Sequence, residues 1–352
     1  MNPFIEHLLS HDSFVIITHL KPDGDAIGSQ LALGLFLEKQ GKRVAMMNTD
    51  DVSPNLQWLP QSDRVTIFDG SMVQREAISG ADCIVIVDTN SQNRLGGLGD
   101  AVLNSPAVKL LVDHHPGPEK WFDAKYVRES ASSTGELVYE IISAIDPDSI
   151  DSEIATALYT AIMTDTGSFR YSHVNATVHR AVADIIERGG VKPESVHDAI
   201  FDSRSLSGLR LLGRALDSIR LTEDGRLGYL VVTQQMLRDA GADRDDTEGF
   251  VNYILSIENV CVALFFFETD SGVKISLRSK AGYRVDQLAR AIGGGGHQNA
   301  SGAFVDGDLQ DAVEQALALA PKYLGPTDES TEVSDEEVAL LSSLMEEKQR
   351  NK

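Results

Sequence analysis

The chain has 352 residues, of which 42% are hydrophobic and 24% charged, an ordinary composition for a globular protein. This length exceeds what one hydrophobic core usually accommodates, so we expect two domains. The formal net charge of -22 argues against a protein that binds long nucleic-acid duplexes, because a strongly acidic surface repels polyanions. A small anionic substrate held through bound cations is compatible with this charge.

The chain contains no segment typical of secretion or membrane insertion. Its N-terminus lacks a basic region followed by a long apolar stretch, and no run approaches the roughly 18 apolar residues of a membrane span. The two cysteines, Cys83 and Cys261, lie in apolar runs, which is more typical of buried thiols than of a disulfide or zinc site. We therefore expect a cytoplasmic protein that makes no contact with a membrane.

The first half of the chain alternates predicted strands with predicted helices. Short runs rich in Val and Ile predict buried strands at residues 14–18, 43–47, 65–68, 83–87 and 108–112. Helical spacing of apolar residues predicts helices at 26–40, 133–145, 153–163 and 176–188. This alternation predicts an α/β domain over residues 1–190 with a doubly wound, mostly parallel sheet.

The pattern changes in the second half. Residues 195–219 are helix-like and polar enough to connect two domains, so we place a helical linker at 191–220. Strands then dominate at 227–233, 260–268 and 272–279, with helices at 285–292 and 309–320. This pattern predicts a smaller, mostly antiparallel α+β domain over residues 221–322. Residues 323–352 form an acidic tail, for which we predict no chemistry.

Carboxylates and histidines follow the predicted strands of the first domain where each strand ends. They are His19, Asp23, Asp25, Asp88 and His114, joined by Asp165 after the helix at 153–163. Ligands of open α/β sheets bind beyond the carboxyl ends of the strands, so we expect these side chains to meet in one crevice. Four carboxylates and two imidazoles are more than one divalent ion usually takes, so the set predicts two ions that share a carboxylate.

The donor types indicate which metal and which reaction to expect. Mixed carboxylate and imidazole ligation suits Mn²⁺ or a similar transition ion better than calcium, and no thiolate is placed to select zinc. Two such ions about 3.5–4 Å apart can clamp a phosphoryl group and lower the pKa of a bridging water, which predicts phosphoester hydrolysis by hydroxide attack. Single residues have simpler explanations: Asp25 could cap a helix, and Asp165 could form a local turn. Six such residues in phase with the sheet favour the metal site.

Four motifs of the chain resemble the DHH phosphoesterase superfamily. They are HLKPDGDAIGS at 19–29, VDTN at 87–90, DHH at 113–115 and TDTGSFRY at 164–171. The resemblance continues through SSTGELVYE at 132–140, EGFVN at 248–252, SLRSK at 276–280 and GGGGH at 293–297. It therefore covers nearly the whole chain up to Pro321, and the second half resembles the C-terminal domain associated with this family.

This resemblance implies a role for each residue of the metal motifs. One ion would be held by His19, Asp23 and Asp88. The other would be held by Asp25, Asp88, His114 and Asp165, so that Asp88 bridges the two ions. Asp113 would orient a ligand histidine through the ring nitrogen that faces away from the ion. His115 would stay off the metal and would contact the phosphate or protonate the leaving oxygen.

Residues of the second domain are candidates for substrate binding. The glycines at 293–296 end in His297, and Arg278 lies upstream on a predicted strand. Glycine lets backbone N–H groups approach an anion, and arginine can grip a phosphate with two donors. The resemblance implies that this region holds nucleotide phosphate or base, and the candidates are Arg278, Gly295, Gly296 and His297. Arg94 and Arg170 adjoin the metal motifs and could reach phosphate, with a surface salt bridge as the alternative for each.

Two further features limit the possible ligands. The glycine-rich runs do not open a strand–turn–helix unit, so we reject a dinucleotide-cofactor site. After GGGGH the chain departs from the Ala-rich pattern of the family, and we expect Asn299 and Ser301 to add hydrogen-bonding groups near the substrate phosphate.

The resemblance points to members of the family that hydrolyse short oligoribonucleotides (nanoRNA) and 3′-phosphoadenosine 5′-phosphate. We expect this activity on short RNA or on mono- and dinucleotides, in a chain for which a homodimer is compatible with the architecture. The nearest alternative is a phosphodiesterase for cyclic dinucleotides of the c-di-AMP type or for linear dinucleotides. Inorganic pyrophosphatase is disfavoured because SLRSK and GGGGH look directed at nucleotides. A catalytically silent nucleotide sensor is disfavoured because all six candidate ligands are present.

Overall fold

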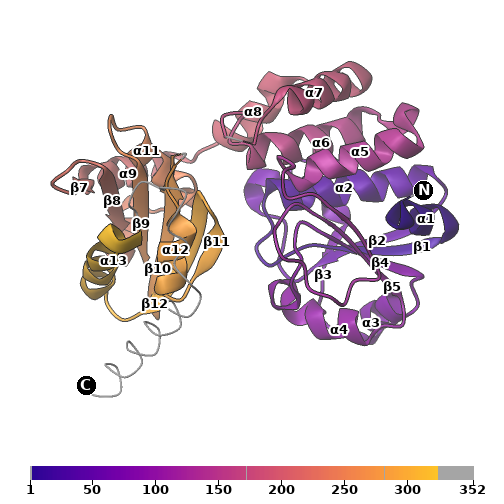
Figure 1. The fold of residues 1–352 in the computed structure, drawn as a ribbon, viewed down its shortest axis with the longest axis horizontal. Helices are drawn as coiled ribbons and strands as arrows, with labels where there is room; N and C mark the ends of the chain where they lie inside the picture. Colours follow the sequence, from indigo (N-terminus) through magenta and orange to yellow (C-terminus); the bar gives the residue numbers. More distant parts are fainter. Residues whose placement is uncertain (1, 172, 281, 324–352) are drawn as a thin grey trace. The chain divides into compact units, whose positions relative to one another are not determined.

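The computed structural model describes residues 2–171, 173–280 and 282–323 (Figure 1). The chain divides into two compact units, one spanning Met1–Ser203 and one starting at Arg204. This break falls inside the stretch 191–220, for which the sequence predicts a linker. That stretch contains helix α8 (Pro193–Phe201) of the first unit and helix α9 (Leu206–Asp217) of the second. The predicted acidic tail, apart from Tyr323, lies outside the described residues.

The strands of the first unit form one parallel sheet in the order β3-β2-β1-β4-β5-β6. Their bounds are β1 Ser13–Ile17, β2 Arg43–Asn48, β3 Val65–Ile67, β4 Cys83–Val87, β5 Val108–Asp113 and β6 Ala124–Val127. The chain builds outward from β1 in one direction and then from β4 in the other. The doubly wound α/β fold predicted from the sequence is thus confirmed. The switch point, where such sheets bind ligands, lies between β1 and β4.

Helices cover both faces of this sheet (Figure 1). On one face, α2 (Gly24–Lys39), α5 (Thr134–Ile145) and α6 (Ser152–Asp165) pack with α1 (Pro3–Ser10) over the larger apolar core, and α7 (Ala176–Gly189) packs on α6. On the other face lie α3 (Met72–Ser79), α4 (Gly99–Asn104) and the 3-10 helix η3 (Gln92–Leu98), over a second core. Short 3-10 turns complete the unit: η1 Pro54–Leu56, η2 Ser62–Arg64 and η4 Pro147–Ser149.

Helices α2 and α6 approach each other closely because glycine stands at their contact. A Cβ atom added at Gly28 would lie 2.5 Å from the carbonyl oxygen of Ala157, and one added at Gly24 would lie 2.5 Å from Oγ1 of Thr164. Any larger residue would therefore push the helices apart. This contact brings the start of α2, which carries Asp25, next to the end of α6, which carries Asp165.

The second unit is built on a mixed sheet with the strand order β11-β12-β10-β9-β8-β7. Its strands are β7 Arg220–Leu221, β8 Leu227–Val232, β9 Val262–Glu268, β10 Gly272–Ser279, β11 Gly295–His297 and β12 Ala300–Asp306. Among the described strands of this second sheet only β8 and β9 pair in parallel, so the predicted, mostly antiparallel α+β arrangement is confirmed. One face packs on α9, α10 (Gln234–Ala240) and α11 (Phe250–Leu255), and η5 (Arg244–Thr247) lies beside α9. The other face packs on α12 (Val285–Ala291) and α13 (Leu309–Tyr323).

Within the described residues, no helix combines the length and the apolar character that a bilayer crossing requires.

Candidate metal centre

The loop between β1 and α2 supplies three of the predicted ligands. Asp23 is the N-cap of α2, and its carboxylate accepts a hydrogen bond from the N–H of Ala26 at 3.1 Å. The alternative that Asp25 caps this helix is therefore wrong, because Asp25 lies inside the first turn and is 1% exposed. The Asp23 side chain is 59% exposed. The short segment at the start of α2 therefore carries one exposed carboxylate, Asp23, and one buried carboxylate, Asp25.

His19 is oriented by the backbone of this loop. Its Nδ1 lies 2.7 Å from the carbonyl oxygen of Leu20, which only accepts hydrogen bonds, so Nδ1 carries the ring proton. Its Nε2 therefore faces the carboxylates, 3.3 Å from Oδ2 of Asp88 and 4.0 Å from Oδ1 of Asp23. A nitrogen lone pair and carboxylate oxygens repel each other unless a proton or a cation lies between them. We call His19, Asp23 and Asp88 the first half-site.

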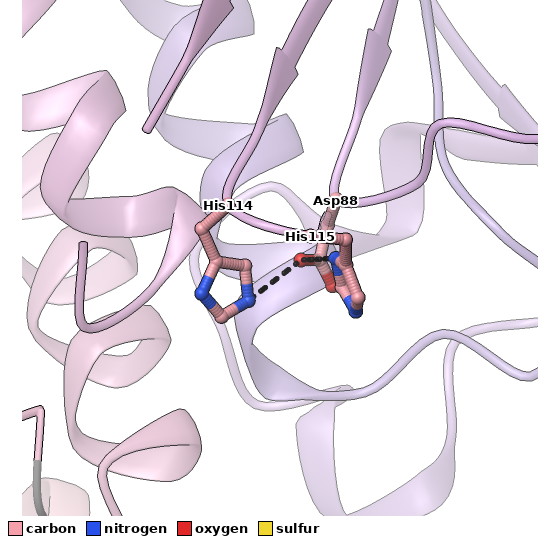
Figure 2. A group of neighbouring side chains, drawn as sticks. All are labelled: Asp88, His114 and His115. Atoms are coloured by element: carbon pink, nitrogen blue, oxygen red, sulfur yellow. Dashed lines mark ion pairs between the residues drawn. The ribbon is translucent and has the colours of Figure 1, made fainter. Parts of the chain in front are cut away.

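A second group of donors surrounds His114, whose ring Figure 2 shows beside Asp88 and His115. Its Nε2 lies 3.4 Å from Oδ2 of Asp165, 3.7 Å from Oδ1 of Asp88 and 3.9 Å from Oδ2 of Asp25. Asp165 is the last residue of α6, so its carboxylate faces the cluster from the helix end. We call Asp25, His114 and Asp165, together with Oδ1 of Asp88, the second half-site.

Asp88 joins the two half-sites from the end of β4. Its φ of 59° is in the left-handed region, which aspartate tolerates better than most residues, and the chain turns sharply there. Oδ2 faces His19 and Oδ1 faces His114. Backbone strain concentrates around this centre: Lys21, Ser168 and Phe169, in the loops beside other candidate ligands, also have positive φ.

The charges of this cluster fit the predicted cations. Burial, followed by the charges of Asp88 and Asp165, raises the pKa of Asp25 well above its usual range. Burial also raises the pKa of Asp165 to about 7, although His114 opposes this shift. Burial lowers the pKa of His19, but the hydrogen bond to Asp88 and the negative charges of Asp23 and Asp88 together outweigh it, and the net shift is upward. The histidines, by contrast, lower the pKa of Asp88 despite its burial. Two carboxylates that resist ionisation and an imidazole that attracts protons indicate an uncompensated negative field, which divalent cations would neutralise.

The donor geometry fits metal ions as well. His19, Asp23 and Asp88 each offer one ligand atom within 4.8 Å of the others, and so do Asp25, His114 and Asp165. In both groups the donors are oxygens and imidazole nitrogens, the ligands of divalent transition ions. The structure therefore brings together all six predicted ligands.

Asp113 has a different partner from the one predicted. Its Oδ1 accepts a hydrogen bond from Nδ1 of His115 at 2.7 Å, whereas Nδ1 of His114 faces the carbonyl oxygen of Ala131 at 3.4 Å. Asp113 therefore orients the catalytic candidate, not a ligand histidine. Burial lowers the pKa of His115, but Asp113 and Asp88 outweigh it and raise this pKa to about 9. His115 also lies within ligand distance of Asp88 and His114, yet its nearer nitrogen is already engaged by Asp113.

The two arginines of the first unit lie beside the metal motifs. Arg94 is exposed, and its charge lowers the pKa of both His19 and His115, so it stands close to the centre. The backbone joins it to the metal loop, since the N–H of Leu20 donates to the carbonyl oxygen of Arg94 at 2.7 Å. Arg170 is exposed and its Nε donates to the carbonyl oxygen of Gly167. Neither arginine forms an ion pair with a described residue. The surface salt bridge considered as an alternative for each of them is therefore not formed within the described part of the chain.

In the second unit the glycine-rich run is a hairpin. Gly295–His297 form β11, which pairs with β12 through Gly295↔Gly302 and His297↔Ala300. Ala300 also pairs with Arg278 on β10, so Arg278 and His297 stand in one row across the sheet, two strands apart. That separation is roughly 10 Å between backbones.

Asn299 and Ser301, expected near the substrate phosphate, lie in and beside the turn between β11 and β12. The amide nitrogen of Asn299 donates within the chain, to Oγ of Ser279 and to the carbonyl oxygens of Lys280 and Tyr283 at 2.9–3.1 Å. Ser301 is buried, at 5% exposure. The amide nitrogen of Asn299 therefore fastens the hairpin turn to the chain segment after β10.

Two functional candidates were missed by the sequence analysis. Thr134 bonds to both Asp25 and Asp88. Asn90 donates from its amide to the carbonyl oxygens of His115 and Pro116 at 3.2 and 3.1 Å, which holds the DHH loop against the end of β4. A signal existed for Thr134, because Ser133 and Glu136 have the spacing of a helix start whose first N–H groups need acceptors.

Comparison with known proteins agrees with this architecture. Residues 13–162 match the model of the DHH family, N-terminal domain, and residues 227–325 match that of the DHHA1 domain. A crystal structure of an exopolyphosphatase-related protein from Bacteroides fragilis superimposes with a TM-score of 0.86 at 34% identity, over 91% of this chain and 95% of that one.

Two relatives align along most of their length. The chain is 32% identical over 310 residues to the bifunctional oligoribonuclease and PAP phosphatase NrnA of Thermus thermophilus, which covers 88% of this chain and 89% of that protein. It is 26% identical over 297 residues to the protein of the same name from Bacillus subtilis, covering 84% and 90%. With both domains matched and the metal motifs assembled, the chain belongs to the DHH family and is a metal-dependent phosphoesterase.

Proposed function

We propose that this enzyme hydrolyses short oligoribonucleotides and 3′-phosphoadenosine 5′-phosphate. The observation that carries the proposal is the pair of half-sites sharing Asp88, with the Asp113–His115 pair beside them. Support for the substrate comes from the relatives named bifunctional oligoribonuclease and PAP phosphatase, which align with both units of this chain. The net charge of -22 agrees with a short substrate, because each further phosphate would add to the repulsion.

We propose two Mn²⁺ ions, one in each half-site. Divalent ions bound there would supply positive charge for the phosphoryl oxygens and a water of lowered pKa as the nucleophile. The side chains of the first half-site (His19, Asp23, Asp88) and of the second (Asp25, Asp88, His114, Asp165) would hold them. Asp88, with one oxygen toward each half-site, would serve both.

His115 is proposed as the group that meets the phosphate and protonates the leaving oxygen. Asp113 fixes the proton on Nδ1, so the ring would act on a substrate through Nε2. A buried carboxylate partner keeps the imidazole protonated near neutral pH, as a general acid requires. Asp113 is thus the residue that sets both the orientation and the charge of His115.

Phosphate and base contacts are proposed for a small set of residues. In the first unit they are Arg94 and Arg170, which are exposed beside the metal motifs. In the second unit they are Arg278 on β10 and Gly295, Gly296 and His297 on β11, two strands away in the same sheet. The proposed division of labour assigns metal chemistry and some phosphate contacts to residues 1–190, and the remaining substrate contacts to residues 221–322. A cytoplasmic homodimer remains our proposal for location and assembly.

The test compares substrates on the purified chain loaded with Mn²⁺. We expect turnover of a diribonucleotide and of 3′-phosphoadenosine 5′-phosphate, and at least about tenfold lower kcat/KM for cyclic di-AMP, a difference of about 1.4 kcal/mol. A long RNA duplex should not be hydrolysed. The His115→Ala variant serves as the control for contaminating nucleases. Cyclic di-AMP as the best substrate would contradict the proposal, and so would the absence of turnover on every nucleotide.

A further inference from the structure

Helix α5 points its N-terminus at the two central carboxylates of the metal centre. Ser133 is its N-cap and accepts a hydrogen bond from the N–H of Glu136 at 3.1 Å. The N–H groups of the next two residues have no partner within the helix, as at any helix start. They donate to Asp25: Thr134 N–H to Oδ2 at 2.7 Å and Gly135 N–H to Oδ1 at 2.8 Å. Both oxygens of Asp25 are thereby fixed by backbone that a side-chain substitution does not remove.

The side chain of Thr134 reaches the second carboxylate. Its Oγ1 donates to Oδ1 of Asp88 at 2.8 Å. Thr134 therefore ties together a residue of α2 and a residue at the end of β4, and all three are at most 3% exposed. In such a buried place a hydroxyl bonded to a carboxylate cannot be replaced by water without a rearrangement.

This bond is asymmetric with respect to the two half-sites. The oxygen that accepts it, Oδ1, is the one that faces His114, at 3.7 Å. The other oxygen, Oδ2, faces His19 at 3.3 Å and has no bond to Thr134. Removing the hydroxyl would therefore release the half of Asp88 that belongs to the second half-site. The first half-site would keep the Asp88 oxygen that faces it.

We propose that Thr134 is a positioning residue that sets the affinity of the second half-site for its ion and leaves the first largely unaffected. This inference rests on the proposed two-ion centre. It assigns to a residue outside the ligand set the control of how many ions the enzyme holds at a given metal concentration. Outer contacts of this kind typically change metal affinity by roughly 10–100-fold.

The test uses Thr134→Val, because valine keeps the branched shape and the backbone N–H but has no hydroxyl. Thr134→Ser, which keeps the hydroxyl, is the matched control. Full-length chains stripped of metal are titrated with MnCl₂ by calorimetry, and low-temperature electron paramagnetic resonance distinguishes a coupled ion pair from single ions. We expect two ions in the wild type and in Thr134→Ser. In Thr134→Val the ion of one half-site should bind as in the wild type, and the ion of the other, which the proposal identifies as the second half-site, should bind at least about tenfold more weakly.

The outcomes separate this inference from the function on which it rests. A wild type that never binds a second Mn²⁺ would overturn the two-ion centre itself. Two ions of unchanged affinity in Thr134→Val would overturn only the role of Thr134, and so would an equal weakening of both ions. Should valine destabilise the fold in thermal unfolding, Thr134→Ala provides the same comparison with a smaller side chain, and a retained second ion in that variant would overturn the proposal.

Discussion

The metal centre of the first unit and the Gly-His hairpin of the second are held in place in different ways. The metal centre gathers mostly buried charged side chains from the ends of β1, β4, β5 and α6 and from the start of α2, and several are fixed by further hydrogen bonds, such as those of Thr134 to Asp25 and Asp88. The hairpin is shaped by glycine and by backbone pairing, and the amide of Asn299 fastens its turn. Like charges that are buried together must be stabilised by many fixed hydrogen-bond donors. A hairpin needs only the backbone hydrogen bonds between its two strands and a turn that is held in place. Substitutions should therefore affect chemistry in the first region and affinity in the second.

The largest effect is expected from the two histidines of the DHH motif. His115→Ala should lower kcat by about 10²–10⁴-fold, since it removes the proposed general acid, and should leave Mn²⁺ content unchanged. His114→Ala should also abolish turnover, but should reduce the bound Mn²⁺ because it removes a ligand of the second half-site. Elemental analysis of both variants beside the wild type checks this difference. Equal metal content in the two variants would contradict the ligand assignment.

Removing the metal should make the stability of the protein depend on pH in a defined direction. The raised pKa values of Asp25 and Asp165 mean that the folded state binds more protons than the unfolded state above about pH 4, so stability falls as pH rises. The raised pKa of His115 acts in the same direction, because its contribution is full below about pH 6.5 and is lost toward pH 9.

Thermal unfolding of the metal-free chain between pH 5 and pH 9 measures this effect. We expect Tm to fall by several degrees over that range, as 1 kcal/mol corresponds to about 2–4 °C for a domain of this size. Saturating Mn²⁺ should raise Tm most at the alkaline end. Metal-free protein that grows more stable toward pH 9 would show that the carboxylates are not in the buried field described here.

In the second unit, Arg278→Ala and His297→Ala should raise KM without loss of metal. Losing a charge-assisted contact to phosphate costs about 1.5–3 kcal/mol, so we expect KM to rise by about 10–100-fold. Arg278→Lys is the informative partner, because it keeps the charge but loses the two-donor grip, and it should fall between the wild type and alanine. Steady-state kinetics on a diribonucleotide give both constants. A fall in kcat with unchanged KM would contradict the prediction that the second unit acts on substrate affinity and the first on chemistry.

The smallest effect is expected at Asn299. Asn299→Ala removes the bonds to Ser279, Lys280 and Tyr283, which loosens the turn between β11 and β12, and should raise KM by only a few-fold, in line with about 1 kcal/mol per lost net bond. Gln298→Ala in the same turn is the control, because the backbone carbonyl of Gln298, which accepts from Val285, is preserved. Equal kinetics for both variants would mean that the Asn299 amide does not position the hairpin.

Sequence reasoning succeeded where local chemistry decides the outcome. The central strands β1, β4 and β5 are continuous apolar runs, and helix α2 ends before Gly41 as its pattern predicts. The predicted metal ligands come together in the structure because donors at the ends of parallel strands must meet. Strands β11 and β12 were missed because Gly295–His297 and Ala300–Asp306 contain too few β-branched residues to signal a strand, and pairing with β10 determines them instead.

The remaining errors concern which side chains form hydrogen bonds with each other, and less often where a residue lies in the fold. Nothing in the spacing of Asp113, His114 and His115 tells which imidazole the carboxylate meets, since the turn after β5 decides this. Likewise, the choice of Asp23 over Asp25 as helix cap depends on where the turn after Pro22 ends. Thr134 illustrates the same limit, because its contacts join segments 46 and 109 residues apart in the chain.

The close contact at Gly28 has a consequence for genetics. This glycine binds nothing, yet its missing side chain is what lets α2 lie against α6 and so sets the distance between Asp25 and Asp165. A screen that scores only lost activity would mark Gly28 together with the ligands, although no atom of it reaches the centre. Mutations that abolish activity will therefore include residues of the α2–α6 interface as well as the metal ligands. Measuring the bound metal of each variant identifies the residues that belong to the ligand set.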